Sequence, residues 1–339
     1  MTAAQFQAAL AAASRCAPGC SPKDLVWESG KLRLFRYRPL PSPSLGAESP
    51  PAVPLLIVYA LVNRPYMMDL QEDRSLIRGL LAEGHDIYLI DWGYPDGSDR
   101  FLALADYIDV LLAGCVGHIQ RARGVESVNL LGVCQGGVLS LCFAALHPGC
   151  VRNLITMVTP VDFHTSADLL SRWVRRIDVP AWVAEGNVSG DALNQLFLSL
   201  MPFRLAHQKY MDLLMGTPDQ SQIDTFMRVE RWIFDSPDQA GAAFCEFVVR
   251  LYQENRLVLH QLQIAGRIVD LRTLKLPLLN LVGSKDHLVP REASLALGRV
   301  VGSDDYTAVE FALGHIGMYI SARAQQEVPA VISRWLAAR

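Results

Sequence analysis

The segment 132–136 reads G-V-C-Q-G and lies between an apolar run at 127–133 and an apolar helical stretch. This strand–turn–helix pattern has the form of the G-x-S-x-G nucleophile elbow, with the sulfur of Cys134 in place of the serine oxygen. Gly132 and Gly136 suit such a turn because side chains there would clash across it. The helix that follows Cys134 points its N-terminal amides at the sulfur and favours the thiolate. We therefore predict a nucleophilic Cys134; the alternative is a cysteine packed in a glycine-rich turn.

An elbow nucleophile needs an acid and a histidine that follow it in that order along the chain. Asp286 follows the apolar run 276–282, and His315 lies between two glycines after the run 308–312. Loops at the carboxyl ends of parallel strands meet at one edge of a sheet, so both side chains are expected to reach Cys134. The alternatives are a turn or N-cap role for Asp286 and a core or capping role for His315.

Four further residues are candidates for the walls of this site. The backbone N–H of Gln135 is expected to form one half of an oxyanion hole. The second donor is expected from the loop after the strand 53–59, where we predict the amide of Val62. Asn63, in the same loop, is a pocket candidate or a turn residue. His287 is a rival base, but a side chain adjacent to the acid usually points away, so it is predicted to line the pocket.

Short apolar runs predict the elements that must hold these residues. Buried strands are expected at 53–59, 87–92, 127–133, 154–158, 276–282 and 308–312, an edge strand at 31–37, and helices at 71–83 and 105–123. Continuous apolar strands that alternate with helices indicate a parallel sheet covered on both faces.

The pattern breaks at 163–270, which is helical and rich in Met, Trp and Phe. We interpret this segment as a cap inserted between two strands of a catalytic core formed by 23–162 and 271–339. Residues 1–22 are interpreted as an N-terminal helical extension, because glutamines interrupt an alanine-rich run that lacks the basic start of a signal peptide.

A cysteine at the elbow favours acyl transfer. A thiolate attacks thioesters well, and the acyl group then sits on another thioester of similar energy. Loading from a CoA thioester is therefore nearly isoenergetic, which suits an acyltransferase better than a hydrolase. An apolar cap would exclude the water that competes for the acyl group.

Composition excludes several classes of protein. The 339 residues are 51% hydrophobic and 19% charged, with a net charge of −3, which argues against disorder and against nucleic acid as a partner. The seven cysteines form no C-x-x-C pair and are expected to be reduced thiols, with no metal and no cofactor. The apolar stretch 130–146 contains three glycines and a glutamine and is short, so no transmembrane segment is predicted.

The box at 132–137, the segment SKDHLVP at 284–290 and the segment GHIGMY at 314–319 together resemble the catalytic subunit of polyhydroxyalkanoate synthases. The resemblance spans roughly 21–336 and includes the whole stretch 58–96. The short chain and Gln135 resemble the class III enzymes of this family. The resemblance implies an α/β-hydrolase fold with a mostly parallel sheet, helices on both faces and an inserted helical cap.

The resemblance also implies a reaction and partners. The family joins (R)-3-hydroxyacyl-CoA units, chiefly 3-hydroxybutyryl-CoA, into a growing polyester and releases CoA. Cys134 would be acylated, His315 would deprotonate it, and Asp286 would help to activate the 3-hydroxyl of the incoming unit. The expected partners are a second copy, a helical E-type subunit and the surface of cytoplasmic polymer granules. The alternatives are a cysteine α/β-hydrolase, such as a thioesterase or lactone hydrolase, and a catalytically silent binding module.

Overall fold

The computed structural model describes residues 19–40, 53–166, 169–200, 208–216 and 219–339. The predicted N-terminal helical extension at 1–22 lies almost entirely outside the described residues, and so does Cys16.

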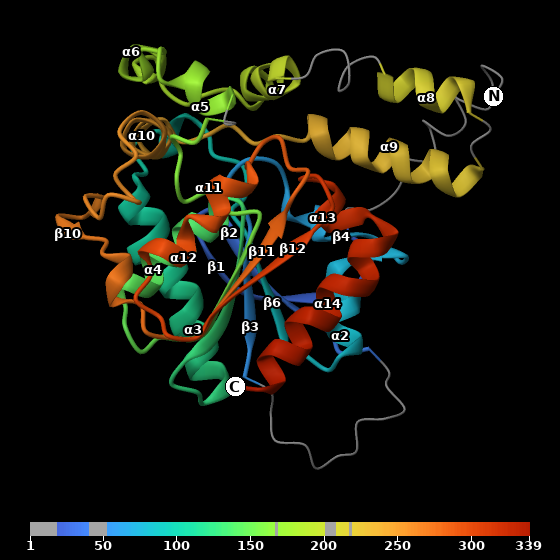
Figure 1. Cartoon of the computed structure of the whole chain (residues 1–339), viewed down its shortest axis with the longest axis horizontal. Coiled ribbons are helices and arrows are strands. Elements are labelled where there is room, and N and C mark those ends of the chain that lie inside the picture. The colour runs from blue at the N-terminus through green and yellow to red at the C-terminus, as the bar shows by residue number, and fades with distance from the viewer. Residues whose placement is uncertain (1–18, 41–52, 167–168, 201–207, 217–218) are drawn as a thin grey trace.

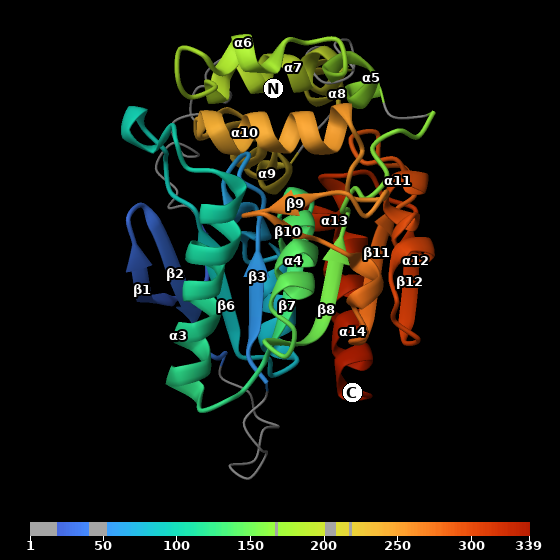
Figure 2. The ribbon, with the colours of Figure 1, turned by 90° about the vertical axis from the view of Figure 1, so that its left-hand side faces the viewer.

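A mostly parallel sheet organises the chain, as predicted (Figures 1 and 2). Its eight strands lie in the order β1 (Lys23–Ser29), β2 (Leu32–Tyr37), β6 (Ile87–Asp91), β3 (Leu55–Val58), β7 (Val128–Val133), β8 (Val151–Met157), β11 (Leu278–Gly283) and β12 (Tyr306–Phe311). The strands from β6 to β12 pair in parallel, whereas β1 and β2 pair antiparallel at one edge. All seven predicted strands are present, but two of them differ in position from the prediction. The predicted edge strand, β2, lies between β6 and an additional strand, β1, which forms the edge instead. The strand predicted as buried at 308–312, β12, forms the opposite edge, and Phe311 is its one buried residue.

The central strands are buried on both faces, which explains their continuous apolar sequences. In β3, Leu56 and Val58 pack into the core on one face of the sheet, and Leu55 and Ile57 pack into the core on the other. Three helices pack into the first core: α3 (Ala113–Arg123), α4 (Gln135–Leu146) and α12 (Leu297–Val300). Three others pack into the second core: α2 (Leu76–Ala82), α13 (Gly317–Ile320) and α14 (Ala322–Ala337).

Two predicted helices differ in detail. The helix expected at 71–83 begins only at Leu76, because the preceding residues form a hairpin of β4 (Asp69–Gln71) and β5 (Arg74–Ser75). The side chain of Ser75 then caps the helix by accepting the N–H of Arg78. The helix expected at 105–123 starts with a π-helical segment, Asp106–Leu112, before α3.

The segment between β8 and β11 is mainly helical, as predicted, and much of it lies above the carboxyl ends of the strands (Figures 1 and 2). Its helices are α5 (Leu169–Val174), α6 (Val179–Val183), α7 (Gly190–Leu200), α8 (Lys209–Met215), α9 (Gln220–Phe234), α10 (Gly241–Phe247) and the π-helical segment Val248–Gln253. The two short strands β9 (Gln263–Ile264) and β10 (Arg267–Ile268) form a separate hairpin. The division into core and cap stays a prediction.

The remaining helical elements are short. In the described ranges they are α11 (Arg291–Leu295) and three 3-10 turns at Pro65–Met68, Gly97–Asp99 and Leu271–Thr273.

Candidate active site

Cys134 lies at the sharp turn between β7 and α4. Its backbone has φ 54° and ψ −121°, a conformation that costs a non-glycine residue roughly 1–3 kcal/mol. Close packing around the turn explains the neighbouring glycines. A Cβ atom on Gly132 would lie 2.5 Å from the Cα of Gly137, and one on Gly136 would collide with the carbonyl oxygen of Val58. The turn therefore presents the Cys134 side chain at the carboxyl edge of the sheet and at the N-terminus of α4.

His315 and Asp286 form a buried pair at the same edge of the sheet. His315 follows β12 and Asp286 follows β11, and the His315 Nδ1 lies 2.6 Å from the Asp286 Oδ2. The other carboxylate oxygen, Oδ1, accepts the backbone N–H groups of Leu288 at 2.8 Å and Val289 at 2.9 Å. A carboxylate can only accept hydrogen bonds, so Nδ1 of His315 carries a proton and Nε2 is the nitrogen available for chemistry.

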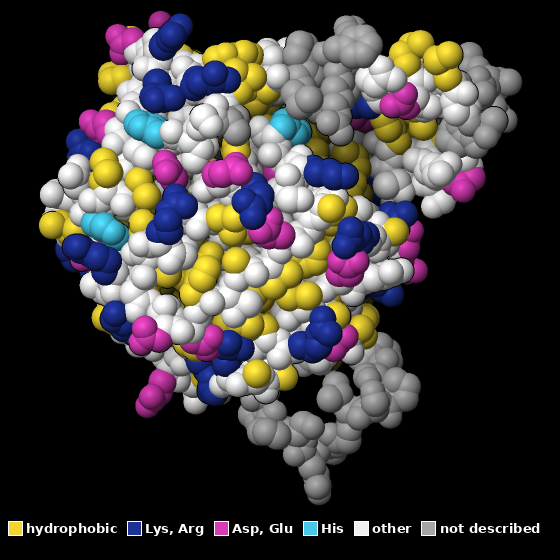
Figure 3. Space-filling view, viewed as in Figure 1, with side chains coloured by type: hydrophobic (Ala, Val, Ile, Leu, Met, Phe, Trp, Pro, Cys, Tyr) yellow, Lys and Arg dark blue, Asp and Glu magenta, His cyan; other side chains and the backbone are white. Residues whose placement is uncertain are grey.

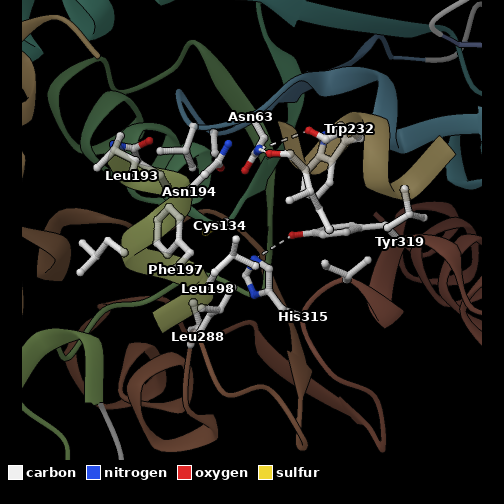
Figure 4. Close-up of a pocket in the computed structure, with 18 of the residues that line it drawn as sticks. Asn63, Cys134, Leu193, Asn194, Phe197, Leu198, Trp232, Leu288, His315 and Tyr319 are labelled. Atoms are coloured by element: carbon white, nitrogen blue, oxygen red, sulfur yellow. Dashed lines mark hydrogen bonds between the residues drawn. The ribbon is translucent and has the colours of Figure 1, made fainter. Parts of the chain in front are cut away.

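The surroundings raise the pKa of His315 above its ordinary value. Burial alone would lower the pKa, but the negative charges of Asp286 and Cys134 and hydrogen bonds with both groups outweigh burial. Cys134 therefore lies close enough to His315 to act on its charge, and Figure 4 shows the two side chains next to each other. Since Asp286 bonds to the other side of the ring, the structure brings the three predicted residues together.

The two predicted oxyanion residues line the same cavity as Cys134. Gln135 opens α4, and Val62 lies in the loop after β3. The Gln135 side chain also accepts the backbone N–H of Leu61 at 3.0 Å, and the Leu61 carbonyl accepts the side chain of Gln239 at 2.9 Å. These bonds hold the loop after β3 against the N-terminus of α4. The role of Val62 and Gln135 in an oxyanion hole stays a prediction.

Asn63 lines the cavity and connects the core to the helical segment above it. Its Nδ2 donates to the Ser236 Oγ at 2.7 Å and to the Ile233 carbonyl at 3.3 Å. Beside it, the indole N–H of Trp232 donates to the Arg64 carbonyl at 2.7 Å. The loop that carries Val62 is therefore tied to the end of α9.

A cavity of about 590 Å³ lies between the carboxyl edge of the sheet and the helices above it. Its volume falls within the usual range of small-molecule sites. Its lining is largely apolar and includes Leu193, Phe197 and Leu288 (Figure 4). Cys134 and His315 open into this cavity, and His287 also lines it, as predicted for a pocket residue. The sulfur of Cys134 therefore faces an apolar chamber.

Tyr319 is a site residue that the sequence patterns did not single out. It lies one helical turn after His315, is 1% exposed, lines the cavity, and its hydroxyl is 3.2 Å from the His315 Nε2. Two signals in the sequence point to it: its place at the end of the GHIGMY segment, and its spacing of four positions after the histidine, which brings two residues of a helical turn together.

The cysteines and other ligating residues show no sign of a metal centre within the ranges that the structure describes. No group of three or more His, Cys, Asp and Glu side chains in these ranges could hold a metal ion. Six cysteines in the described residues form no disulfide.

Comparisons with known proteins place the chain in a family. Residues 53–321 match the model of the alpha/beta hydrolase fold family. The chain is 52% identical to the poly(3-hydroxyalkanoate) polymerase subunit PhaC of Allochromatium vinosum, in an alignment that covers 94% of this chain and 89% of that protein. It is 46% identical to the subunit of the same name from Synechocystis, with 95% and 85% covered. The chain belongs to the PhaC polymerase family.

Solved structures agree with this PhaC chain in fold alone. A monoacylglycerol lipase from Paleococcus ferrophilus is 17% identical with a TM-score of 0.53, over 85% of this chain and 96% of that one. An alpha/beta hydrolase fold protein from Chitinophaga pinensis is 15% identical with a TM-score of 0.53, over 96% and 100%. In the described parts of this PhaC chain, no helix is both long and apolar enough to cross a membrane.

Proposed function

We propose that this chain is the catalytic subunit of a poly(3-hydroxyalkanoate) polymerase that joins (R)-3-hydroxyacyl-CoA units, chiefly 3-hydroxybutyryl-CoA, through an acyl thioester on Cys134. The observation that carries the proposal is a cysteine in a strained elbow beside a His315–Asp286 pair, open to an apolar cavity. The sequence identity between this chain and PhaC proteins, over most of the chain, supports the same activity.

In the loading step, the sulfur of Cys134 attacks the thioester carbonyl of the acyl-CoA. His315 Nε2 holds the proton of the thiol during the attack, and Asp286 keeps the ring in the required tautomer. The amides of Gln135 and Val62 stabilise the oxyanion. CoA leaves as the thiol with the proton from His315, which leaves a neutral imidazole beside the acyl-enzyme.

In the elongation step, the hydroxyl of another hydroxyacyl unit attacks the Cys134 thioester. The hydroxyl proton passes to the His315 Nε2, the new ester bond forms, and the sulfur leaves, so the starting state returns. Both oxygens of Asp286 are engaged and its side chain is 0% exposed, which supports a role exerted through His315 rather than by direct contact with the hydroxyl.

The apolar cavity supports acyl transfer over hydrolysis. Its aliphatic and aromatic lining would hold the acyl chain and keep bulk water from the thioester. Water would otherwise compete with the substrate hydroxyl for the acyl group.

We also propose that the protein acts as a homodimer with an E-type helical subunit, at the surface of polymer granules in the cytoplasm. Apolar side chains exposed on the helical segment support an interaction of this kind. They include Trp173, which is 38% exposed, Met215, which is 79% exposed, and Phe234, which is 54% exposed. On the face shown in Figure 3, apolar side chains are visible near α8, and acidic and basic side chains are mixed.

The decisive experiment mixes the protein with 3-hydroxybutyryl-CoA and follows CoA release and turbidity. Release of CoA with turbidity from polymer is expected, and Cys134→Ala should abolish both while the protein stays folded. Release of CoA with free 3-hydroxybutyrate would instead indicate a hydrolase, and no release would indicate a binding module. Near-normal CoA release by Cys134→Ala would show that another residue is the nucleophile.

A further inference from the structure

The hydroxyl of Tyr319 occupies a position that the acyl-transfer scheme leaves unexplained. It lies 3.2 Å from the His315 Nε2, the atom that must accept each proton in the cycle. The tyrosine is 1% exposed, and its ring packs edge-on against the rings of His315 and Tyr59. Figure 4 shows the hydroxyl of Tyr319 pointing at the ring of His315, next to Cys134.

The elongation step needs a group that holds the attacking hydroxyl near His315. Asp286 is not available for this task, because Oδ2 bonds to His315 and Oδ1 accepts two backbone N–H groups. Tyr319 lines the cavity next to Nε2 and carries a hydroxyl. Burial raises the pKa of this phenol well above its ordinary value, so it stays protonated and can donate a hydrogen bond.

We propose that Tyr319 is a catalytic residue of elongation that binds the hydroxyl group of the attacking hydroxyacyl unit. This inference rests on the proposed polymerase function. In the free enzyme the phenol oxygen lies 3.2 Å from Nε2 of His315. When the acyl-enzyme has formed, the substrate hydroxyl enters between them, donates its proton toward Nε2 and accepts the phenol O–H at its oxygen.

The proton balance of this step is complete. The substrate O–H proton moves to the His315 Nε2 while the substrate oxygen bonds to the thioester carbon. The carbon–sulfur bond then breaks, and the Cys134 sulfur and Nε2 share the proton. Tyr319 keeps its own proton throughout, and its hydrogen bond stabilises the negative charge that develops on the substrate oxygen.

A pair of substrates separates loading from elongation. Butyryl-CoA can acylate Cys134 but lacks the 3-hydroxyl needed for elongation, whereas 3-hydroxybutyryl-CoA supports both steps. In Tyr319→Phe, acylation by butyryl-CoA, measured by mass spectrometry of rapidly quenched protein, should stay within about twofold of wild type. With 3-hydroxybutyryl-CoA, kcat should fall by roughly 10- to 100-fold and acyl-Cys134 should accumulate.

Tyr107→Phe is the matched control. Tyr107 is a buried tyrosine, 3% exposed, that lies outside the residues lining the cavity and packs against Trp92. This variant should acylate and elongate at nearly the wild-type rate, and circular dichroism should show both variants folded.

Two results would overturn the inference. Equal slowing of both steps in Tyr319→Phe would mean that the tyrosine acts on His315 alone. Normal kinetics with both substrates would mean that its hydroxyl has no role. Failure of the wild-type protein to acylate Cys134 with either substrate would count against the polymerase function itself, which is a distinguishable result.

Discussion

At the residue scale, the site depends on how the hydrogen bonds of Asp286 are distributed. The two backbone N–H groups at Leu288 and Val289 both point at Oδ1, so only Oδ2 is left for His315. This arrangement fixes the orientation of the carboxylate as well as that of the imidazole ring. In the proposed mechanism, the acid therefore has a positioning role, and Nε2 of His315 accepts the proton.

Asp286→Asn is expected to impair loading as severely as His315→Gln. The asparagine oxygen would be retained by the two backbone N–H groups, so its Nδ2 would face Nδ1 of His315. The ring would then have to accept there and carry its proton on Nε2, the wrong tautomer for a base. We expect a loss of roughly 10³–10⁴-fold in acylation of Cys134 in either variant.

Single-exposure mass spectrometry with 3-hydroxybutyryl-CoA measures this acylation directly. The family resemblance implies a separate role for Asp286 in activating the 3-hydroxyl. An Asp286→Asn variant that acylates Cys134 at the normal rate but stalls before polymer would support that separate role and contradict the tautomer argument.

The charge of His315 should make the stability of the protein depend on pH. Burial opposes the charge, but Asp286 and Cys134 raise the pKa from 6.5 to about 10 on folding. A group whose pKa rises on folding stabilises the native state fully below its unfolded pKa, and this contribution is lost as the pH rises through the folded pKa. The excess in unfolding free energy of wild type over His315→Gln should therefore be largest below pH 6.5 and shrink toward pH 10.

Urea unfolding at a series of pH values tests this expectation. The same comparison in a Cys134→Ala background removes the titration of the thiol. The protein with His315 should still have the higher unfolding free energy there, but without Cys134 the pKa of His315 rises less on folding. The advantage should therefore be lost over a narrower range of pH. A difference that stays constant across the range would show that folding leaves the pKa of His315 unchanged.

At the scale of elements, the β7–α4 junction requires close approach of backbone to backbone. Gly136 lies at the start of α4, where a Cβ atom would strike the carbonyl oxygens of Val58 and Tyr59 at the end of β3. Backbone atoms cannot move aside as a flexible side chain can. The absence of a side chain at Gly136 therefore allows the N-terminus of α4 to come close to the loop after β3, which carries the predicted oxyanion donor Val62.

Gly136→Ala is expected to lower the unfolding free energy by roughly 1–3 kcal/mol and to reduce acylation strongly, because α4 must shift away from β3. Gly97→Ala is the control, since a Cβ atom there meets nothing within 4 Å. Its stability should stay within about 0.5 kcal/mol of wild type. Denaturant unfolding and acylation rates measure both effects, and a fully stable, active Gly136→Ala would mean that the junction is looser than described.

At the scale of the whole molecule, the helices above the sheet are held in two different ways. The end of α9 is fastened to the core, since Asp235 accepts the hydroxyls of Tyr66 at 3.0 Å and Tyr94 at 2.6 Å. Other parts of the helical segment pack into small separate clusters, such as the one around Leu170, Val179 and Leu200. The α10 helix is fastened as well, because its Ala243 and Phe247 belong to the main core. Access to Cys134 therefore depends on a layer that is attached firmly at α9 and α10 and packs into smaller clusters elsewhere.

Hydrogen exchange should detect this difference. Amides of α7 and α8 are expected to exchange faster than those of β3, β7 and β11, because their buried apolar clusters are smaller. Asp235→Ala should accelerate exchange in α9 further, whereas Asp304→Ala, at an exposed position before β12, should not. Uniform protection of the helical segment and the sheet would contradict a mobile cap.

Short stretches of sequence carry most of the information on fold class and on the three central residues. Apolar runs of strand length, alternating with helices, predict a sheet buried on both faces. A glycine-flanked cysteine between a strand and a helix predicts the elbow, and the chain order of Cys134, Asp286 and His315 matches the fold. These features follow from local backbone geometry and burial, which neighbouring residues determine together.

Tertiary structure alone decided the contacts that distinguish the roles of these residues. The pairing of Tyr319 with Nε2, the use of both oxygens of Asp286, and the bond from Leu61 to the Gln135 side chain each depend on side-chain directions after packing. Likewise, Asn63 appears in the sequence as a turn or pocket residue, yet its amide bonds to Ser236, which is 173 positions away. Such bonds depend on the relative placement of distant segments, which the pattern of any one segment does not contain.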